Sequence, residues 1–216
     1  MEKMIRICGL GTRPPDETTL ETLQALEGCR VVFSDVADES VFAWLGGYCR
    51  RLSRPKSAAD VVAAAHKGGP VGLAVWGHPQ FSSLLARRVQ NEARAAGVPF
   101  TVAGAISPIG SAFARSVSFL GGDYGYQGIQ GYELSALLAA PGAMTTELPL
   151  VVYAEAAAAR DWSRLHALLK SSYPAAHELI VYPASGGPER RLAVGSLGEG
   201  RDEGAVILVP PAAKTR

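Results

Sequence analysis

Cysteine is scarce in this chain of 216 residues, which contains only three. Cys8, Cys29 and Cys49 are odd in number, and no two of them form a C-x-x-C pair. A disulfide framework or a zinc site needs paired and suitably spaced ligands. We therefore expect no bound metal and free thiols in a reducing compartment.

Excess charge of one sign and long apolar runs are also missing. Lys and Arg number 21 against 20 Asp and Glu, which gives a net charge of +1, whereas a nucleic-acid surface normally leaves a clear basic excess. No apolar run approaches the roughly 20 residues of a membrane-spanning helix. The first residues also lack the apolar region of a secretory signal. We expect a cytoplasmic protein that binds neither nucleic acid nor membranes.

The chain does contain enough apolar sequence for a large core, because 48% of its residues are hydrophobic and only 19% are charged. In the first half, short apolar runs alternate with longer helical patterns. We expect strands at residues 4–8, 31–33, 71–76 and 100–102, and helices at 19–26, 57–65 and 82–96. Strands that alternate with helices predict a mostly parallel sheet covered by helices.

The second half has a different pattern. We expect helices at residues 111–119 and 161–170, and strands at 148–153, 179–182, 192–194 and 205–209. Residues 121–132, which are rich in Gly and Tyr, predict no regular structure. The change of pattern predicts two lobes, residues 1–105 and 106–216.

Three loops each follow a predicted strand of the first lobe. They contain Gly9-Leu10-Gly11, residues 76–82, and residues 103–108. In open α/β sheets, ligands bind beyond the carboxyl ends of the strands. We therefore regard these loops as ligand-binding candidates, although His78 could equally be structural and Ser107 could be only a helix cap.

The first loop permits a second interpretation. Gly9-x-Gly11, with Asp35 after the next strand, resembles half of a dinucleotide fingerprint. The third glycine is missing, however, and Pro14-Pro15 interrupt the place where the phosphate-binding helix should begin. A loop for a different ligand, or a plain tight turn, fits the sequence better.

In their order and spacing, the three loops resemble those of the tetrapyrrole methylase superfamily of S-adenosylmethionine (SAM)-dependent methyltransferases. Those enzymes carry a glycine loop, a G-D-P-type loop and a P-G-V-S-type loop. Gly77-His78-Pro79 is similar to the Y-G-H-P loop of the borosin-type peptide α-N-methyltransferases within that superfamily. Residues 125–133 and 173–182 also resemble segments of the borosin branch, and the similarity extends from about residue 5 to 211.

This resemblance implies two α/β lobes, each a helix-covered sheet, with SAM in the cleft between them. It also implies a homodimer. Residues 121–132 are a candidate for its interface or for the wall of the substrate channel, because tyrosine provides a large contact area with a polar tip. Carried over position by position, the implied cofactor contacts are Trp76, His78, Phe81, Ser82, Ser107, Pro108, Ala154, Ala184, Ala205 and Val206.

The chain departs from the borosin enzymes in the Tyr- and Arg-containing segment that serves catalysis there. Tyrosine and arginine can stabilise the negative charge that develops when an amide loses its proton. The candidate substitutes here are Tyr48, Arg50, Arg51 and Arg54. Our hypothesis is a methyltransferase that acts in trans on a backbone amide of a separate peptide, as in RiPP biosynthesis. A methyltransferase of a tetrapyrrole or other small molecule, and an inactive SAM-binding scaffold, remain as alternatives.

Overall fold

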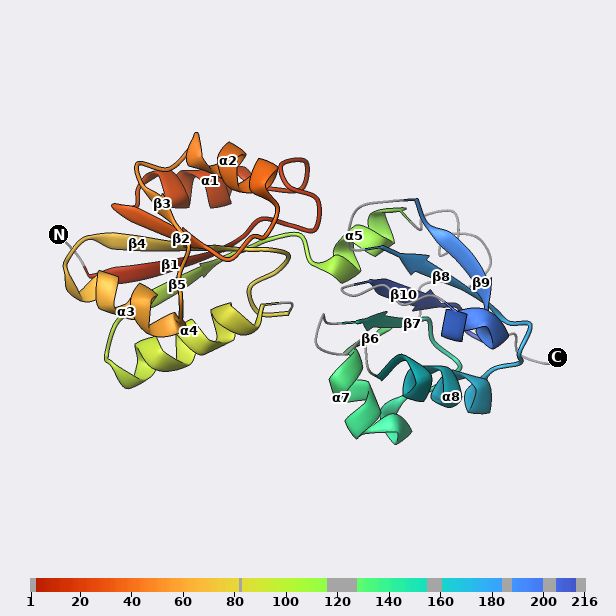
Figure 1. Cartoon of the computed structure of the whole chain (residues 1–216). Helices are drawn as coiled ribbons and strands as arrows, with labels where there is room; N and C mark the ends of the chain where they lie inside the picture. The colour runs from red at the N-terminus through yellow and green to blue at the C-terminus, as the bar shows by residue number, and fades with distance from the viewer. Residues whose placement is uncertain are drawn as a thin grey trace. The chain divides into compact units, whose positions relative to one another are not determined.

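A computed structural model describes residues 3–81, 83–115, 128–154, 161–183, 188–199 and 205–212. The chain divides into two compact units, Met1–Pro108 and Ile109–Arg216. Each unit contains one five-stranded sheet with helices packed on it (Figure 1). The predicted fold class, two α/β lobes with helix-covered sheets, is confirmed.

A parallel sheet forms the centre of the first unit. Its strands are β1 (Met4–Gly9), β2 (Val31–Ser34), β3 (Leu52–Ser53), β4 (Pro70–Val75) and β5 (Phe100–Ala103), in the order β3-β2-β4-β1-β5. All of its pairs are parallel. The strands therefore end at one edge, called the carboxyl edge below, and begin at the opposite, amino edge. This topology brings the three candidate loops to the same edge.

Helices cover both faces of this sheet (Figure 1). They are α1 (Leu20–Glu27) and α2 (Glu39–Gly46) on one face, and α3 (Ala58–His66) and α4 (Leu84–Ala95) on the other. The predicted cap of α1 is present, since the Thr19 side chain accepts a hydrogen bond from the Thr22 N–H at 3.1 Å. This cap fixes the start of α1 beside the carboxyl edge of β1.

The second unit has a mixed sheet of β6 (Gln130–Glu133), β7 (Leu150–Tyr153), β8 (Glu178–Tyr182), β9 (Arg190–Ala193) and β10 (Val206–Val209). Their order is β6-β7-β10-β8-β9, and only β6 and β7 pair in parallel. Its helical elements are α5 (Pro108–Arg115), α7 (Leu134–Ala139), α8 (Trp162–Ser172) and the short 3-10 helices η1 (Pro141–Ala143) and η3 (Val194–Glu199). The apolar sides of α7 and α8 pack on one face of the sheet and form the core of this unit.

Strand β6 corrects one prediction, because residues 130–132 were expected to be irregular. The buried Gln130 side chain donates to the carbonyl oxygens of Thr145 (2.6 Å) and Leu148 (3.1 Å), and its oxygen accepts from the Thr145 N–H at 2.8 Å. These contacts and the pairing with β7 are made to residues distant in sequence, which a local pattern does not reveal. Residues 121–127 lie outside the described part of the chain.

Candidate functional site

Two of the three candidate loops are joined to each other by backbone hydrogen bonds. The Gly77 N–H donates to the Gly11 carbonyl at 2.9 Å, and the Gly11 N–H donates to the Gly77 carbonyl at 3.4 Å. Both residues have a positive φ, 78° for Gly11 and 71° for Gly77. Glycine adopts this conformation without the steric cost that a side chain brings. The two glycines therefore fix the loops after β1 and β4 relative to each other.

The third loop meets the other two at Gly9. A Cβ atom on Gly9 would lie 2.3 Å from the Gly77 oxygen, 2.5 Å from the Ala105 Cβ and 2.7 Å from the Pro79 Cδ. We call Gly9, Gly11, Gly77, Pro79 and Ala105 the loop junction. No side chain fits at its centre, and Gly9, Gly11, Gly77 and Pro79 are themselves buried. A ligand at this edge therefore meets the half-buried side chains beside the junction, and an adenosine with few polar contacts suits such a surface.

A buried carboxylate shapes the loop after β1. Glu17 is 7% exposed, and its Oε2 accepts from the Thr12 N–H at 2.9 Å, the Thr12 hydroxyl at 2.6 Å and the Arg13 N–H at 3.2 Å. A Cβ on Gly11 would lie 2.6 Å from the Glu17 Cβ. Sequence reasoning missed Glu17, because an acid between a proline pair and a helix cap carries no recognisable pattern.

The loop after β4 holds three of the predicted cofactor residues: Trp76, His78 and Phe81 are all half-buried. The His78 Nδ1 accepts from the Gln80 N–H at 3.2 Å, which places the proton of the neutral ring on Nε2. Burial lowers the pKa of His78, so the ring is neutral at pH 7. Ser82 lies outside the described residues.

The loop after β5 ends in Ser107, and Pro108 is the first residue of α5. Proline suits the first position of a helix, where no intrahelical N–H partner is lost. This placement agrees with either role proposed for Ser107, a helix cap or a ligand contact. Both residues follow the same edge of the sheet as the loop junction.

Asp35 follows β2 at the carboxyl edge, next to the end of β4 in the sheet. Its side chain reaches solvent, but the protein around it displaces enough water to raise the pKa of the carboxyl, and a backbone hydrogen bond offsets part of the rise. A perturbed acid at a ligand-binding edge is a candidate for function. Sequence reasoning had named Asp35 only in the dinucleotide interpretation.

The structure does not bring the four predicted catalytic residues together. Arg51 precedes β3, and its carbonyl accepts from the Val32 N–H at 2.8 Å near the start of β2. Arg50 lies beside it, and Tyr48 contacts Trp44 near the end of α2, with 5.4 Å between ring centroids. These three residues lie toward the amino edge of the sheet, whereas Arg54 follows β3 at the carboxyl edge.

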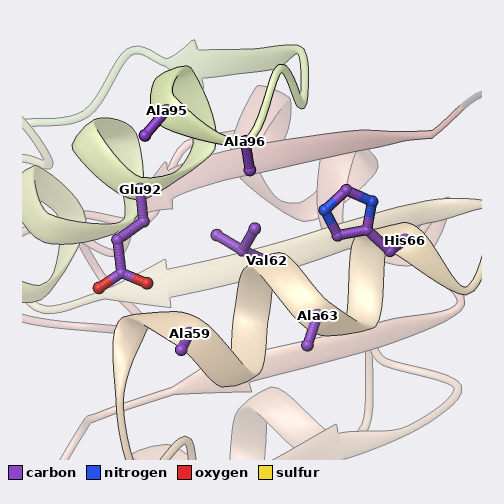
Figure 2. Close-up of a pocket in the computed structure, with 7 residues that line it drawn as sticks. All are labelled: Ala59, Val62, Ala63, His66, Glu92, Ala95 and Ala96. Atoms are coloured by element: carbon purple, nitrogen blue, oxygen red, sulfur yellow. The ribbon is translucent and has the colours of Figure 1, made fainter.

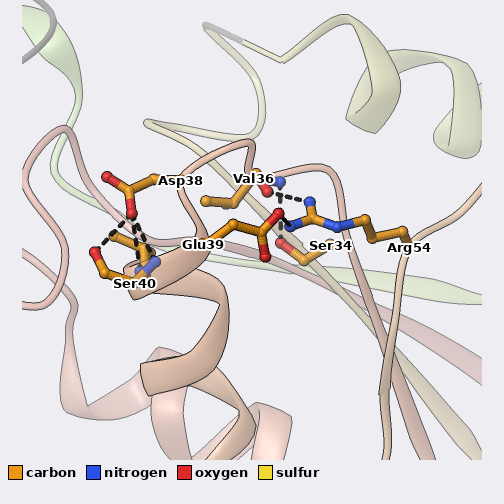
Figure 3. Close-up of polar contacts among 7 residues, drawn as sticks. Ser34, Val36, Asp38, Glu39, Ser40 and Arg54 are labelled. Carbon is orange, nitrogen blue, oxygen red and sulfur yellow. Dashed lines mark hydrogen bonds and ion pairs between the residues drawn. The ribbon is translucent and has the colours of Figure 1, made fainter.

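Arg54 is engaged with the segment that carries Asp35 (Figure 3). Its guanidinium donates to the Val36 carbonyl and, at 2.7 Å, to Glu39, and it lies 4.0 Å from the centroid of the Phe42 ring. These contacts hold the β2–α2 connection against the end of β3.

In the second unit, three predicted cofactor residues come together. The Ala154 N–H donates to the Ala205 carbonyl at 2.8 Å, and the next residue, Val206, pairs with Tyr153 on one side and Tyr182 on the other. All three predicted residues are buried, so they could act only through shape and backbone. Ala184, the fourth candidate of this unit, lies outside the described residues.

A surface hollow lies away from these loops (Figure 2). It measures about 430 Å³ and runs between α3 and α4, lined by Ala59, Val62, Ala63, His66, Glu92, Ala95 and Ala96. His66 and Ala95 are at the ends of their helices, toward the amino edge. We do not assign the cofactor to this hollow.

Comparisons with known proteins decide the family. The family model Tetrapyrrole (Corrin/Porphyrin) Methylases matches residues 4–200. The chain belongs to this family. No curated protein matches the sequence.

Solved structures share its fold. A uroporphyrin-III-C-methyltransferase from Thermus thermophilus has a TM-score of 0.70 at 21% identity, over 97% of this chain and 95% of that one. A cobalt precorrin-4 methyltransferase of cobalamin biosynthesis has a TM-score of 0.73 at 14% identity, over 96% and 95%. A T. thermophilus uroporphyrin-III C-methyltransferase complexed with S-adenosylhomocysteine has a TM-score of 0.68 at 17% identity, over 96% and 92%.

Several predictions are thus confirmed. As a member of this family, the protein is a methyltransferase, and its methyl donor is SAM. The described helices include none long and apolar enough to cross a membrane. The borosin branch and the peptide acceptor are finer predictions than the family membership supports.

Proposed function

We propose that this methylase transfers the methyl group of SAM to a separate tetrapyrrole-type small molecule at the carboxyl edge of the first unit's sheet. One observation carries the choice of acceptor. The structure places Asp35, His78 and the loop junction at this edge, but Tyr48, Arg50 and Arg51 toward the other one. The residues expected to activate a peptide amide are therefore not assembled as a group.

The residues around the loop junction fit SAM. The buried glycines hold the three loops close together, and the half-buried Trp76 and Phe81 beside them supply apolar surface for adenosine. SAM brings an activated methyl group on a good leaving group. The protein's own task is to align the acceptor with that group.

Asp35 and His78 can assist the acceptor. A pyrrole ring that accepts a methyl group on carbon becomes cationic and returns to neutrality by losing a proton from another atom of the ring system, and the Asp35 carboxylate can receive that proton. Neutral His78 offers its Nε2 proton as a hydrogen-bond donor. In this proposal Arg54 acts indirectly, because it holds the segment that carries Asp35.

A peptide acceptor is the second candidate. The similarity of Gly77-His78-Pro79 and of residues 173–182 to the borosin branch supports it. On this hypothesis the chain would methylate a peptide supplied in trans, and Arg54 is the one of the four predicted catalytic residues that lies at the same edge as the loop junction.

Calorimetry with S-adenosylhomocysteine tests the cofactor site. The wild type should bind it, and Gly77→Leu should not, because a side chain at φ 71° is strained and would project at the loop junction. Folded wild-type protein that binds no S-adenosylhomocysteine would refute the proposal. Circular dichroism of the variant would establish that it is folded.

Mass spectrometry then separates the acceptors. The protein is incubated with SAM and either uroporphyrinogen III or a set of apolar peptides, and methyl mass is sought on each substrate. Methylation of the tetrapyrrole supports the first candidate. Methylation of a peptide amide supports the second.

A further inference from the structure

Arg13 lies in the loop after β1 and has no part in the chemistry described so far. Its Nε donates to the Glu17 Oε1 at 3.1 Å, and its side chain is 43% exposed. The pair therefore joins a buried carboxylate to a guanidinium that reaches the surface. Within the described part of the chain, no hydrogen bond or ion pair of the two Nη atoms is found.

The way Glu17 holds Arg13 determines what the guanidinium presents. Contact through Nε uses the inner edge of the fork, so the outer edge with both Nη atoms stays available. That edge is planar, always charged and matched to a carboxylate that binds through two parallel hydrogen bonds. The other Glu17 oxygen is occupied by Thr12 and by the Arg13 N–H. The carboxylate is therefore anchored from both sides.

The loop junction is close to this pair. The Glu17 side chain packs on Gly11, which is hydrogen-bonded to Gly77 of the β4 loop. Arg13 follows Gly11 by two residues. Its charged head is thus tied, through Glu17, to the loop junction, beside which the proposed function places the cofactor.

We propose that Arg13 is a carboxylate-binding residue of this site and that Glu17 positions it. This inference rests on the proposed function. A carboxylate can come from the amino-acid part of SAM or from an acidic side group of the acceptor. Both have the same chemistry, and the experiment distinguishes them.

Binding titrations with two variants provide the test. Arg13→Gln removes the charge and the fork, and Arg13→Lys keeps the charge without the fork. Lys67→Gln is the control, because Lys67 is exposed after α3 at the amino edge and its loss changes the net charge equally. The probes are S-adenosylhomocysteine, 5′-methylthioadenosine (which lacks the carboxylate) and uroporphyrin III, which carries several.

If Arg13 binds the cofactor, Arg13→Gln should weaken S-adenosylhomocysteine by about tenfold or more and leave 5′-methylthioadenosine unchanged. If it binds the acceptor, only uroporphyrin III should weaken by that factor. Arg13→Lys should fall between the wild type and Arg13→Gln, and Lys67→Gln should match the wild type.

Two results would overturn the assignment of Arg13. One is wild-type affinity of Arg13→Gln for all three probes. The other is an equal loss for all three together with a lower melting temperature, which would reveal a purely structural ion pair. Wild-type protein that binds none of the probes overturns the proposed function as well, so the two failures are distinguishable.

Discussion

Two aspartates only three residues apart have opposite electrostatic environments. Loss of water around Asp35 raises the pKa of its carboxyl. Hydrogen bonds from the Ser40 hydroxyl and from the Val41 and Ser40 N–H groups lower the pKa of Asp38, which caps α2. From the sequence alone, residues 35–39 are one acidic turn. The difference arises from where the backbone places each carboxyl.

Substitution of these two residues should therefore change stability in opposite directions. A raised pKa means that the folded state binds the Asp35 proton more tightly than the unfolded state does. The stability that this gives is present below the unfolded pKa and is lost as pH rises through the folded pKa. At pH 7, Asp35→Asn should increase the free energy of unfolding, and the gain should vanish as pH approaches the ordinary aspartate pKa. Urea unfolding at several pH values measures this. A gain that does not depend on pH would contradict the assigned cause.

Asp38→Asn is the counterpart. A lowered pKa stabilises the fold above the unfolded pKa, and the stabilisation is lost as pH falls through the folded value. Asparagine still accepts the cap hydrogen bonds but lacks the charge. The variant should be less stable than the wild type at pH 7 and should approach it in acid. Equal unfolding midpoints at pH 7 would show that the charge contributes nothing.

The three cysteines should be unreactive thiols. Burial raises the pKa of Cys8 to about 12 and that of Cys49 to about 11, and it also raises the pKa of Cys29. The thiolate is the reactive form, so Ellman's reagent at pH 8 should label native protein slowly and denatured protein at once. Fast labelling of a thiol in the native state would contradict this prediction. The partly exposed Cys49 is the thiol to check first.

At the scale of elements, close packing at Gly9 holds the three loops together. Gly9→Ala would place a methyl group within 2.7 Å of atoms from two other loops. The loops must then separate, with a loss of about 1–3 kcal/mol of stability and a marked loss of S-adenosylhomocysteine affinity.

Gly46→Ala is the control for this variant. Gly46 is in α2, and a Cβ there would meet only the Leu52 Cδ2 at an ordinary 3.9 Å. A helical alanine should keep or raise stability by about 0.5 kcal/mol. Thermal melts and calorimetry of both variants measure the contrast. Gly9→Ala that binds as tightly as Gly46→Ala would remove the loop junction from the site.

The sequence predicted the elements that local contacts stabilise and missed those that depend on contacts between distant residues. The strands β1, β4 and β5 and the helices α1, α3 and α4 follow from apolar runs, periodicity and cap residues. By contrast, β3 has only two residues and exists through its pairing with β2. The same limit applied to the site, since the Gly11–Gly77 bonds and the Glu17 carboxylate depend on contacts made only in the folded chain.

At the scale of the whole molecule, each unit has its own apolar core, with Leu165 and Ile207 in the second unit and Val61 and Val89 in the first. The predicted two-lobed organisation was visible in the sequence because the spacing of apolar residues changes between the halves. The carboxyl-edge position of the loops followed from a parallel sheet. The sequence could not show that Arg54 lies at the opposite edge of the sheet from Tyr48, Arg50 and Arg51. The strand between them, β3, has only two residues and leaves no recognisable pattern.

Assembly into a homodimer stays a prediction, and it can be tested on the described end of the segment 121–132. Ile129 is an apolar residue with 42% of its surface exposed, so its side chain is accessible to a second copy. Light scattering at micromolar concentration should give twice the chain mass of 22.6 kDa. Ile129→Asp should shift the mass toward the monomer, because a carboxylate would be buried without a partner.

Leu20→Asp is the control. It introduces the same charge on α1 at a side chain that is 76% exposed, and it should leave the mass unchanged. A monomeric wild type would refute the dimer, and a dimeric Ile129→Asp would remove this segment from its interface.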